Sequence, residues 1–442
     1  MEITIHRGTH EIGGNCVEIA TGESRIILDV GMPLFNQDRE PHNTGALRRR
    51  TTAQLRQSGV LPNVPGLFDE SNSCPDAILL SHAHEDHTGL LGHSHPDIPI
   101  YASVGTSKMM LAGAKFAGQP TLPRERHRDL TSGQPVQIGE FTITPYSVDH
   151  SIYGGQAFLI EAAGKTVLYS GDLRLHGRKP SMHRALVEAA RNRTIDVLLM
   201  EGTHIAHTNH RGQTEFELED EITRYITNAS GLVLASFSPQ HVDRLVGFIR
   251  ASLKAKRIFV VDAYTAFIMH LIASELPIPR PESAEQIKVF FPWFFEESFR
   301  RKKLEKFFSL LSPARIGIDE IRQNPSRYAM VFRPSMISSD FGGSLPSQSK
   351  CLYSRWSGYL EQNEWQTTKV KLEEVSGDLI EVHTSGHIYH DDIIEFVGQI
   401  NAKSVIPIHT FEPERFLQHF QNAMLLQDGE TWNGNRFPPS VM

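Results

Sequence analysis

The stretch Leu79–His87 reads LLSHAHEDH, and it places three histidines and one aspartate within six residues. An apolar run that reads as a buried strand precedes it. Because the chain turns where a strand ends, the four side chains can converge on one point. His82 and His84 are two residues apart, so both project to the same side of an extended segment. Asp86 and His87 come one turn later and can serve a neighbouring ion. Imidazole and carboxylate together suit zinc or a similar divalent metal.

Three further candidate ligands stand farther along the chain, each just after a predicted strand. They are His150 after the strand 141–148, Asp172 after 166–170 and His409 after 404–408. A single histidine or aspartate in such a place is more often an ordinary loop residue. Their arrival in this order after the first cluster favours a shared metal site instead. The chain's 22 histidines, a high number for its length, point the same way.

The composition is that of a globular chain. Its 442 residues are too many for one ordinary core, so we expect two compact units. Hydrophobic residues make up 40% and charged residues 21%, which argues against wholesale disorder. No apolar run reaches the ~18 residues that a membrane span needs, and Met1–His6 does not resemble a signal peptide. Three scattered cysteines are too few for a disulfide framework. The sequence therefore predicts a cytoplasmic protein that does not cross a membrane.

Two patterns of predicted secondary structure divide the chain. The first part shows short β-branched-rich runs separated by glycine and polar turns, which is typical of an α/β layered sandwich. From Thr214 onward helices and strands alternate regularly, which predicts a parallel sheet with crossover helices, a second α/β unit. The last part is expected to return to a strand at 379–383 and to end in a helix at 413–425. Residues 36–74 are expected to form a long loop.

The metal-ligand pattern, which continues through Ser170-Gly171-Asp172, resembles the signature of the metallo-β-lactamase fold. The opening segment GTHEIGGN at 8–15 and Asp29-Val30-Gly31 also resemble the first hairpin of that fold. In small members of the fold the last histidine follows the aspartate closely, whereas here the second α/β unit separates Asp172 from His409. This unit resembles the inserted cap of the β-CASP nucleases, a group that includes ribonuclease J.

The resemblance implies the fold class and the domains. The implied fold is α/β, a metallo-β-lactamase αββα sandwich with an inserted β-CASP α/β cap domain. The first part of the sandwich would occupy 1–208, the cap 209–375 and the C-terminal part of the sandwich 376–442. The resemblance also predicts that the C-terminal domain of ribonuclease J is missing, since the chain ends about thirty residues after His409. It is compatible with a homodimer.

The resemblance also implies how the ligands are shared. One zinc would be held by His82, His84 and His150, the other by Asp86, His87 and His409, with Asp172 as the bridge. The implied cofactor is two Zn²⁺, with Mn²⁺ as an alternative. Two such cations can share a water and lower its pKa to about 7, which supplies a nucleophile for a phosphodiester.

Two further residues match family motifs. Glu201, in LMEGT at 199–203, matches the acidic residue after the aspartate motif, and His387, in TSGH at 384–387, matches a motif linked to the cap. His387 is the candidate that protonates the leaving oxygen and contacts the substrate, with Glu201 orienting it. The catalytic candidates are therefore Asp86, Glu201 and His387. The alternatives are a histidine that only hydrogen-bonds the scaffold and a largely structural glutamate.

Phosphate recognition rests on weaker signals. Ser236 and Ser238, in ASFS, resemble the phosphate-side loop of the cap and precede a predicted helix, and Ser335 follows another strand. Hydroxyls at helix starts are often plain caps instead. The formal net charge of −7 excludes a generally cationic nucleic-acid binder but allows a local basic channel. Basic clusters at 48–50, 124–128 and 174–179 are candidates for that channel, although such runs are usually solvated surface.

The leading hypothesis is a metal-dependent ribonuclease that cleaves single-stranded RNA and leaves 5′-phosphate ends, with RNA as its partner. A DNA nuclease of the same family is the first alternative, but its DNA-repair branch typically carries valine at the position of His409. A small-ester or thioester metallo-hydrolase would need only a pocket, not a large inserted unit. A non-catalytic scaffold would be expected to lose ligands, and this chain retains all seven. The sequence does not distinguish exonuclease from endonuclease action.

Overall fold

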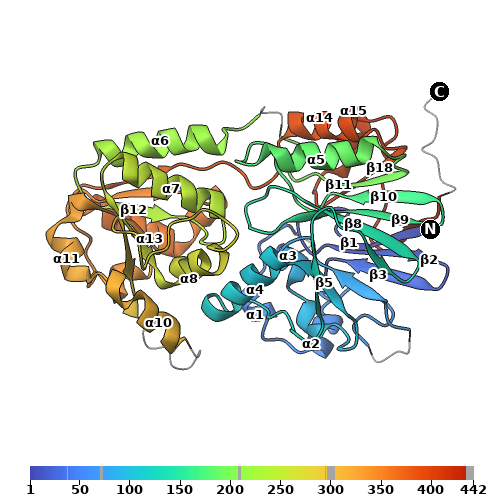
Figure 1. The fold of residues 1–442 in the computed structure, drawn as a ribbon, viewed down its shortest axis with the longest axis horizontal. Helices are drawn as coiled ribbons and strands as arrows, with labels where there is room; N and C mark the ends of the chain where they lie inside the picture. Colours follow the sequence, from blue (N-terminus) through green and yellow to red (C-terminus); the bar gives the residue numbers. More distant parts are fainter. Residues whose placement is uncertain (37, 70–72, 208–210, 294, 296–303, 435–442) are drawn as a thin grey trace. The chain divides into compact units, whose positions relative to one another are not determined.

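The chain folds as two compact units (Figure 1). The computed structural model describes residues 1–36, 38–69, 73–207, 211–293, 295 and 304–434. The first unit combines Met1–Gly212 with Gly386–Met442, and the second is the inserted segment Gln213–Ser385. The boundaries expected from the sequence lay after residues 208 and 375. The second unit extends past 375 because the strand Asp378–Glu381 joins its sheet.

A seven-stranded sheet forms one layer of the first unit, in the order β19-β1-β2-β3-β4-β5-β6. Its strands are β1 (Glu2–Arg7), β2 (Cys16–Thr21), β3 (Ser24–Leu28), β4 (Ala77–Leu79), β5 (Ile100–Ser103), β6 (His127–Leu130) and β19 (Glu430–Trp432). The pairings are antiparallel from β19 to β3 and parallel from β3 to β6. Parallel strands β3 and β4 therefore end at the same edge, and this edge carries part of the site described below.

A six-stranded sheet forms the second layer, in the order β18-β11-β10-β9-β8-β7. Its strands are β7 (Val136–Ile138), β8 (Phe141–Ser147), β9 (Gln156–Ala162), β10 (Lys165–Tyr169), β11 (Val197–Glu201) and β18 (Ser404–Ile408). Strands β10, β11 and β18 run parallel to one another, and β7 to β10 pair antiparallel. The carboxyl ends of three parallel strands thus meet at one edge.

Helices cover the outer faces of both sheets in the first unit. They are α1 (Thr44–Leu47), α2 (Thr52–Gln57), α3 (Glu85–Thr88) and α4 (Val104–Phe116) beside the seven-stranded sheet, and α5 (Pro180–Arg191), α14 (His390–Ile400) and α15 (Phe416–His419) beside the six-stranded one (Figure 1). Strand β11 shows why the layers stack. Val197 and Leu199 lie in the core between the sheets, whereas Leu198 and Met200 lie in the core under the helices. Both faces of a central strand are buried this way. The predicted αββα sandwich is confirmed.

The second unit is a parallel sheet with crossover helices, as the alternating rhythm predicted. Its strand order is β14-β13-β15-β12-β16-β17, and every pairing is parallel. The strands are β12 (Val233–Ser236), β13 (Ile258–Asp262), β14 (Ile287–Phe290), β15 (Tyr328–Val331), β16 (Lys350–Tyr353) and β17 (Asp378–Glu381). The helices are α6 (Glu215–Asn228), α7 (Val242–Lys254), α8 (Ala263–Ile272), α10 (Glu305–Leu311), α11 (Ile318–Gln323), α12 (Met336–Ser339) and α13 (Asn363–Glu373).

Short 3₁₀ helices join several elements: η1 (Leu91–His93), η2 (Ser312–Ala314), η3 (Pro325–Arg327), η4 (Ser357–Glu361) and η5 (Pro413–Arg415). No helix in the described ranges is both long and apolar enough to cross a bilayer.

Two sequence expectations differ from the structure. The helix expected at 413–425 is wrong, because only η5 and the four-residue α15 form. The chain then pairs with the edge of β18, where the Val405 N–H donates to the Asn422 carbonyl and the Met424 N–H to the Val405 carbonyl. The predicted loop at 36–74 contains α1 and α2, capped by the side chains of Asn43 and Thr51.

Candidate metal centre

The first four candidate ligands lie on the short connection between β4 and α3 and on the first turn of α3. Strand β4 ends at Leu79, an extended segment follows, and α3 begins at Glu85 with His84 in the N-cap position. His82 and His84 therefore stand on the extended segment, and Asp86 and His87 on the first turn of a helix. The side chain of His84 makes no capping hydrogen bond, so its imidazole is available to the cluster.

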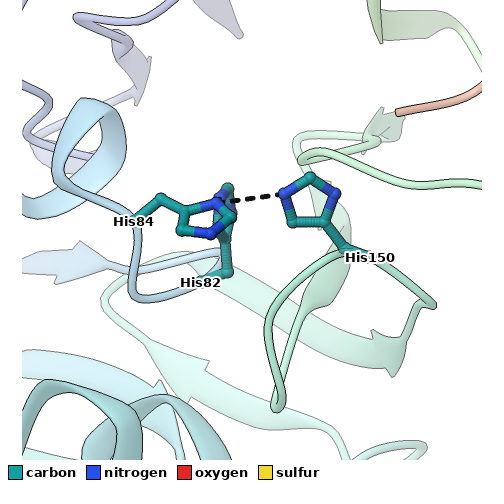
Figure 2. A group of neighbouring side chains, drawn as sticks. All are labelled: His82, His84 and His150. Atoms are coloured by element: carbon teal, nitrogen blue, oxygen red, sulfur yellow. Dashed lines mark hydrogen bonds between the residues drawn. The ribbon is translucent and has the colours of Figure 1, made fainter. Parts of the chain in front are cut away.

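The first group of donors consists of His82, His84 and His150, whose rings point toward one another from two separate loops (Figure 2). His84 Nδ1 lies 3.0 Å from His82 Nε2 and 3.1 Å from His150 Nε2. A ring nitrogen carries either one hydrogen or one lone pair, so His84 Nδ1 cannot make a full hydrogen bond with both neighbours at once. Three imidazole nitrogens that converge on one point form a donor set suited to a divalent cation.

The second group consists of Asp86, His87, Asp172 and His409, all buried. His87 Nε2 lies 3.1 Å from Asp172 Oδ2, and His409 Nε2 lies 3.8 Å from Asp86 Oδ2. Two buried atoms of this group, Asp172 Oδ1 and His409 Nε2, have no hydrogen-bond partner among the described residues. A buried polar atom without a partner is costly, and a bound cation would satisfy both.

Asp172 lies between the two groups. Its Oδ2 atom is 3.1 Å from His87 Nε2 in the second group, and 3.6 Å and 3.8 Å from His82 Nε2 and His150 Nε2 in the first. One carboxylate thus reaches both sets of nitrogens. The structure also groups His387 with His150 and Asp172 as a third set of close donor atoms.

Burial keeps most of the imidazoles neutral, the form that binds metals. It lowers the pKa of His84 to about 3 and that of His409 to about 4. Burial also lowers the pKa of His82 and His150 well below the usual value. His87 is the exception. Burial opposes its charge, but the carboxylates of Asp172, Asp29 and Asp86 outweigh burial and raise its pKa well above the usual value.

Contacts behind the cluster fix the ring orientations. His87 Nδ1 lies 2.7 Å from Asp29 Oδ2, His150 Nδ1 lies 2.6 Å from the Gly386 carbonyl, and His409 Nδ1 lies 3.2 Å from Asn15 Oδ1. An acceptor at one ring nitrogen leaves the other nitrogen facing the metal position. Asp29 is itself held by the Ser81 N–H and hydroxyl, both at 2.7 Å, and by the Tyr169 hydroxyl at 2.6 Å.

The sequence did not reveal these supporting roles. Asp29 and Asn15 stood out only as parts of motifs at the start of the fold. Polar residues next to strand ends were the available signal. The partners, however, are distant in the chain, and only the folded sheets bring them together.

Glu201 and His387 form a hydrogen-bonded pair beside the cluster. Glu201 ends β11, is fully buried, and its Oε2 lies 3.0 Å from His387 Nδ1. The Leu173 N–H and the Thr203 hydroxyl donate to the same carboxylate. Burial raises the pKa of Glu201. Burial opposes the charge of His387, but Glu201 and Asp172 raise its pKa to about 9. The two carboxylates therefore favour the protonated form of His387, which lies next to the candidate metal ligands.

The predicted phosphate-binding serines belong to the second unit, whereas the cluster belongs to the first. Ser236 ends β12 and is buried, Ser238 follows it, and Ser335 precedes the four-residue α12 without capping it through its side chain. The structure therefore brings together the seven predicted metal ligands with Glu201 and His387, but not the serines, in one unit.

Several arginines of the predicted basic clusters have structural partners. Arg48 pairs with Glu85, Arg126 donates to the Ile98 carbonyl and the Ser94 hydroxyl, and buried Arg174 pairs with Asp149.

Comparisons with known proteins agree with this geometry. Residues 51–227 match the family described as "Beta-lactamase superfamily domain", and residues 373–431 match "Zn-dependent metallo-hydrolase RNA specificity domain". A protein named "Ribonuclease J" from Mycolicibacterium smegmatis is 23% identical over 433 residues, which cover 92% of this chain and 68% of that protein. A "Ribonuclease J" from Pyrococcus abyssi is 27% identical over 264 residues, which cover 57% of this chain and 56% of that protein.

A solved structure has the same fold along almost the whole chain. It is a protein of unknown function from Enterococcus faecalis V583, with a TM-score of 0.77, 22% sequence identity, and coverage of 98% of this chain and 99% of that one. The cluster, with its imidazole and carboxylate donors, is suited to a divalent metal. The chain therefore combines a metallo-β-lactamase domain with a metallo-hydrolase RNA-specificity domain, and the ribonuclease J proteins are its homologues at modest identity.

Proposed function

We propose that the protein is a metal-dependent ribonuclease that hydrolyses phosphodiester bonds of single-stranded RNA. The observation that carries the proposal is the convergence of six imidazole and carboxylate side chains around a seventh, Asp172. Such a donor set, in a chain whose homologues are ribonuclease J proteins, supports phosphodiester hydrolysis more than any other chemistry.

The proposed cofactor is a pair of Zn²⁺ ions, with Mn²⁺ as an alternative. His82, His84 and His150 would hold one ion, Asp86, His87 and His409 the other, and Asp172 would bridge them. The two unpartnered buried atoms, Asp172 Oδ1 and His409 Nε2, support this assignment. When bound, the ions would lower the pKa of a water and offset the charge that develops on the phosphate.

The residues of the chain have separate tasks in this proposal. His82, His84, His150 and His409 stay neutral because they are buried, so their lone pairs are available. His87, whose pKa is raised, would have to lose a ring proton to bind a metal. The Asp29, Gly386 and Asn15 contacts orient three of the rings. His387, whose pKa is raised to about 9, carries the proton that the departing 3′-oxygen needs, and Glu201 holds its ring at 3.0 Å. Departure of the 3′-oxygen leaves a 5′-phosphate on the product.

The proposed compartment is the cytoplasm. Cys16 and Cys351 are buried free thiols, which supports a reducing environment. The homodimer stays a prediction.

The test combines metal analysis with product mapping on the same purified protein. Mass spectrometry is expected to find two divalent ions per chain. End-labelled single-stranded RNA is expected to give fragments with 5′-phosphate ends, and a DNA oligonucleotide of matched sequence to be cleaved more slowly. Fragments with 2′,3′-cyclic phosphate ends would contradict the mechanism, because they require attack by the RNA's own 2′-hydroxyl. Faster cleavage of the DNA would overturn the choice of substrate.

A further inference from the structure

The second unit has a cluster of polar side chains at the carboxyl ends of its central strands. Four neighbouring strands, β13, β15, β12 and β16, end side by side, and adjacent strands lie about 4.8 Å apart. Asp262 ends β13, Arg333 follows β15, Ser236 ends β12 and Arg355 follows β16. The backbone bonds from Phe332 N to the Ala235 carbonyl and from Ser354 N to the Ser236 carbonyl hold these ends in register.

Two of these strands mark a place where ligands bind in open α/β sheets. From β12 the chain crosses over through α7 toward β13, and from β16 it passes through α13 to β17 on the other side. Neighbouring strands whose connections leave in opposite directions open a crevice at their carboxyl ends. Ser236 and Arg355 stand at that point, with Arg333 one strand away.

Several polar atoms of this strand-end cluster have no partner. Ser236 is 1% exposed, and its buried hydroxyl makes no hydrogen bond with any described residue. The same holds for Arg355 Nε and for one terminal nitrogen of Arg333. Native proteins rarely leave a buried donor unsatisfied, so three at one sheet edge indicate a ligand that accepts hydrogen bonds.

The charges of the cluster identify the ligand class. Arg333 pairs with Asp262, whose other oxygen accepts two hydrogen bonds from Thr265. Arg355 has no carboxylate at ion-pair distance within the described ranges, and it donates only to the Phe237 carbonyl, at 3.0 Å. The nearest compensation comes from Glu364, which acts on Arg355 from beyond ion-pair distance. Burial, and then the charge of Arg333, lower the pKa of Arg355, so an anion would relieve a repulsion between the two guanidinium groups.

We propose that Ser236, Arg333 and Arg355 form a binding site for a phosphate group in the second unit. Phosphate oxygens accept hydrogen bonds from guanidinium groups and hydroxyls, and one guanidinium group can donate to two of these oxygens at once. The assignment of this site to a phosphate of the RNA chain rests on the proposed function. A free mononucleotide offers the same group. Trp356 directly follows Arg355, and its ring contacts that of Tyr359. Both rings are about half exposed and offer a face on which a base can stack.

The site can be tested by binding alone, on the full chain with metal removed by chelation so that RNA stays intact. The probes are a labelled single-stranded RNA decamer, adenosine 5′-monophosphate and inorganic phosphate. Arg355→Gln and Arg333→Gln are each expected to weaken binding about tenfold, and Ser236→Ala about threefold, as loss of a charged or a neutral hydrogen bond predicts. Arg355→Lys should restore part of the loss, because it keeps the charge.

The matched control is Arg327→Gln. Arg327 lies just before β15, as Arg333 lies just after it, so this variant removes a positive charge at the opposite edge of the same sheet. Its binding should be unchanged. Thermal melting of each variant checks folding, and Ser236→Ala, a small change, keeps the test decisive if an arginine variant fails to fold.

The three probes separate the outcomes. Weaker RNA binding in the strand-end variants, but not in the control, assigns the site to an RNA phosphate. Losses confined to the mononucleotide and inorganic phosphate assign it to a free nucleotide. Unchanged binding of all three probes overturns the site. A chain that binds these probes as expected but never cleaves RNA would sink the proposed function and leave this inference standing.

Discussion

Each unit buries a group of charged and polar side chains, and the two groups are completed in different ways. In the second unit, Arg244 is fully buried. It bonds Glu215 through two nitrogens, at 3.3 and 3.0 Å, and also bonds Ser354 and the Thr384 carbonyl. In the first unit, the cluster around Asp172 leaves Asp172 Oδ1 and His409 Nε2 without hydrogen-bond partners in the part of the chain that the structure describes. A buried network in which the polar groups all pair with one another is structural, whereas a buried network with unpartnered polar atoms is shaped for a ligand.

The contrast between the two buried groups is tested most directly by removing Asp172, the side chain that lies between the two sets of metal-binding candidates. Asp172→Ala is expected to abolish cleavage, a loss larger than the roughly 10²–10³-fold cost of removing one charge-stabilising group. Metal content should also fall. The control is Asp196→Asn, a buried carboxylate of the same unit that pairs with Lys403 outside the cluster. Substantial cleavage by metal-loaded Asp172→Ala protein would refute the bridging role.

His387 tests whether the pair beside the cluster acts on the substrate or on the metal. If His387 supplies a proton, His387→Ala should lower the rate by about 10²–10⁴-fold with the metal retained. The structure also places His387 among close donor atoms with His150 and Asp172. Measurement of metal content alongside the rate separates the two roles, and loss of an ion from this variant would reassign His387 as a ligand.

For the Arg244 and Glu215 network of the second unit we expect an effect on stability and none on metal binding. Arg244→Met removes the permanent positive charge that pairs with the buried Glu215 carboxylate and leaves the His241 ring, 3.2 Å away, which is charged only when protonated. The free energy of unfolding should therefore fall by about 3–5 kcal/mol. Zinc stoichiometry should not change. The double variant Arg244→Met with Glu215→Leu should recover much of the stability, because no lone charge remains. A single variant as stable as the parent in a urea titration would show that the network is not structural.

Most of the candidate metal ligands could be predicted from the sequence because their chemistry is distinctive and their position at strand ends is local. His82, His84, Asp86 and His87 need only one strand end and one helical turn to converge. What could not be predicted depends on distant contacts. Asn15 and His409 are 394 residues apart in the chain, and Gly386 and His150 are 236 apart.

The same reason accounts for the errors. The helix expected at 413–425 gave way to pairing with the edge of β18, an interaction that helical periodicity cannot reveal. Arg244, a few residues after the serines of the predicted phosphate-side loop, is buried against Glu215. A motif predicts which residues stand near each other in the chain, but the packing of the sheet decides which of them stay free for a ligand.

The smallest effect on metal binding is expected at Asp29, which contacts the candidate ligand His87 on the side away from the metal position. This carboxylate accepts from Ser81 and Tyr169 and lies 2.7 Å from His87 Nδ1. Asp29→Asn preserves size but removes the charge that fixes the His87 ring, so zinc affinity should weaken about 10–100-fold. Tyr169→Phe, which removes only one bond to Asp29, should weaken it less. Competition with a chromophoric chelator measures both. Equal zinc affinity in Asp29→Asn and the parent would mean that packing alone orients His87, and that the buried carboxylate serves Ser81 and Tyr169 rather than the metal.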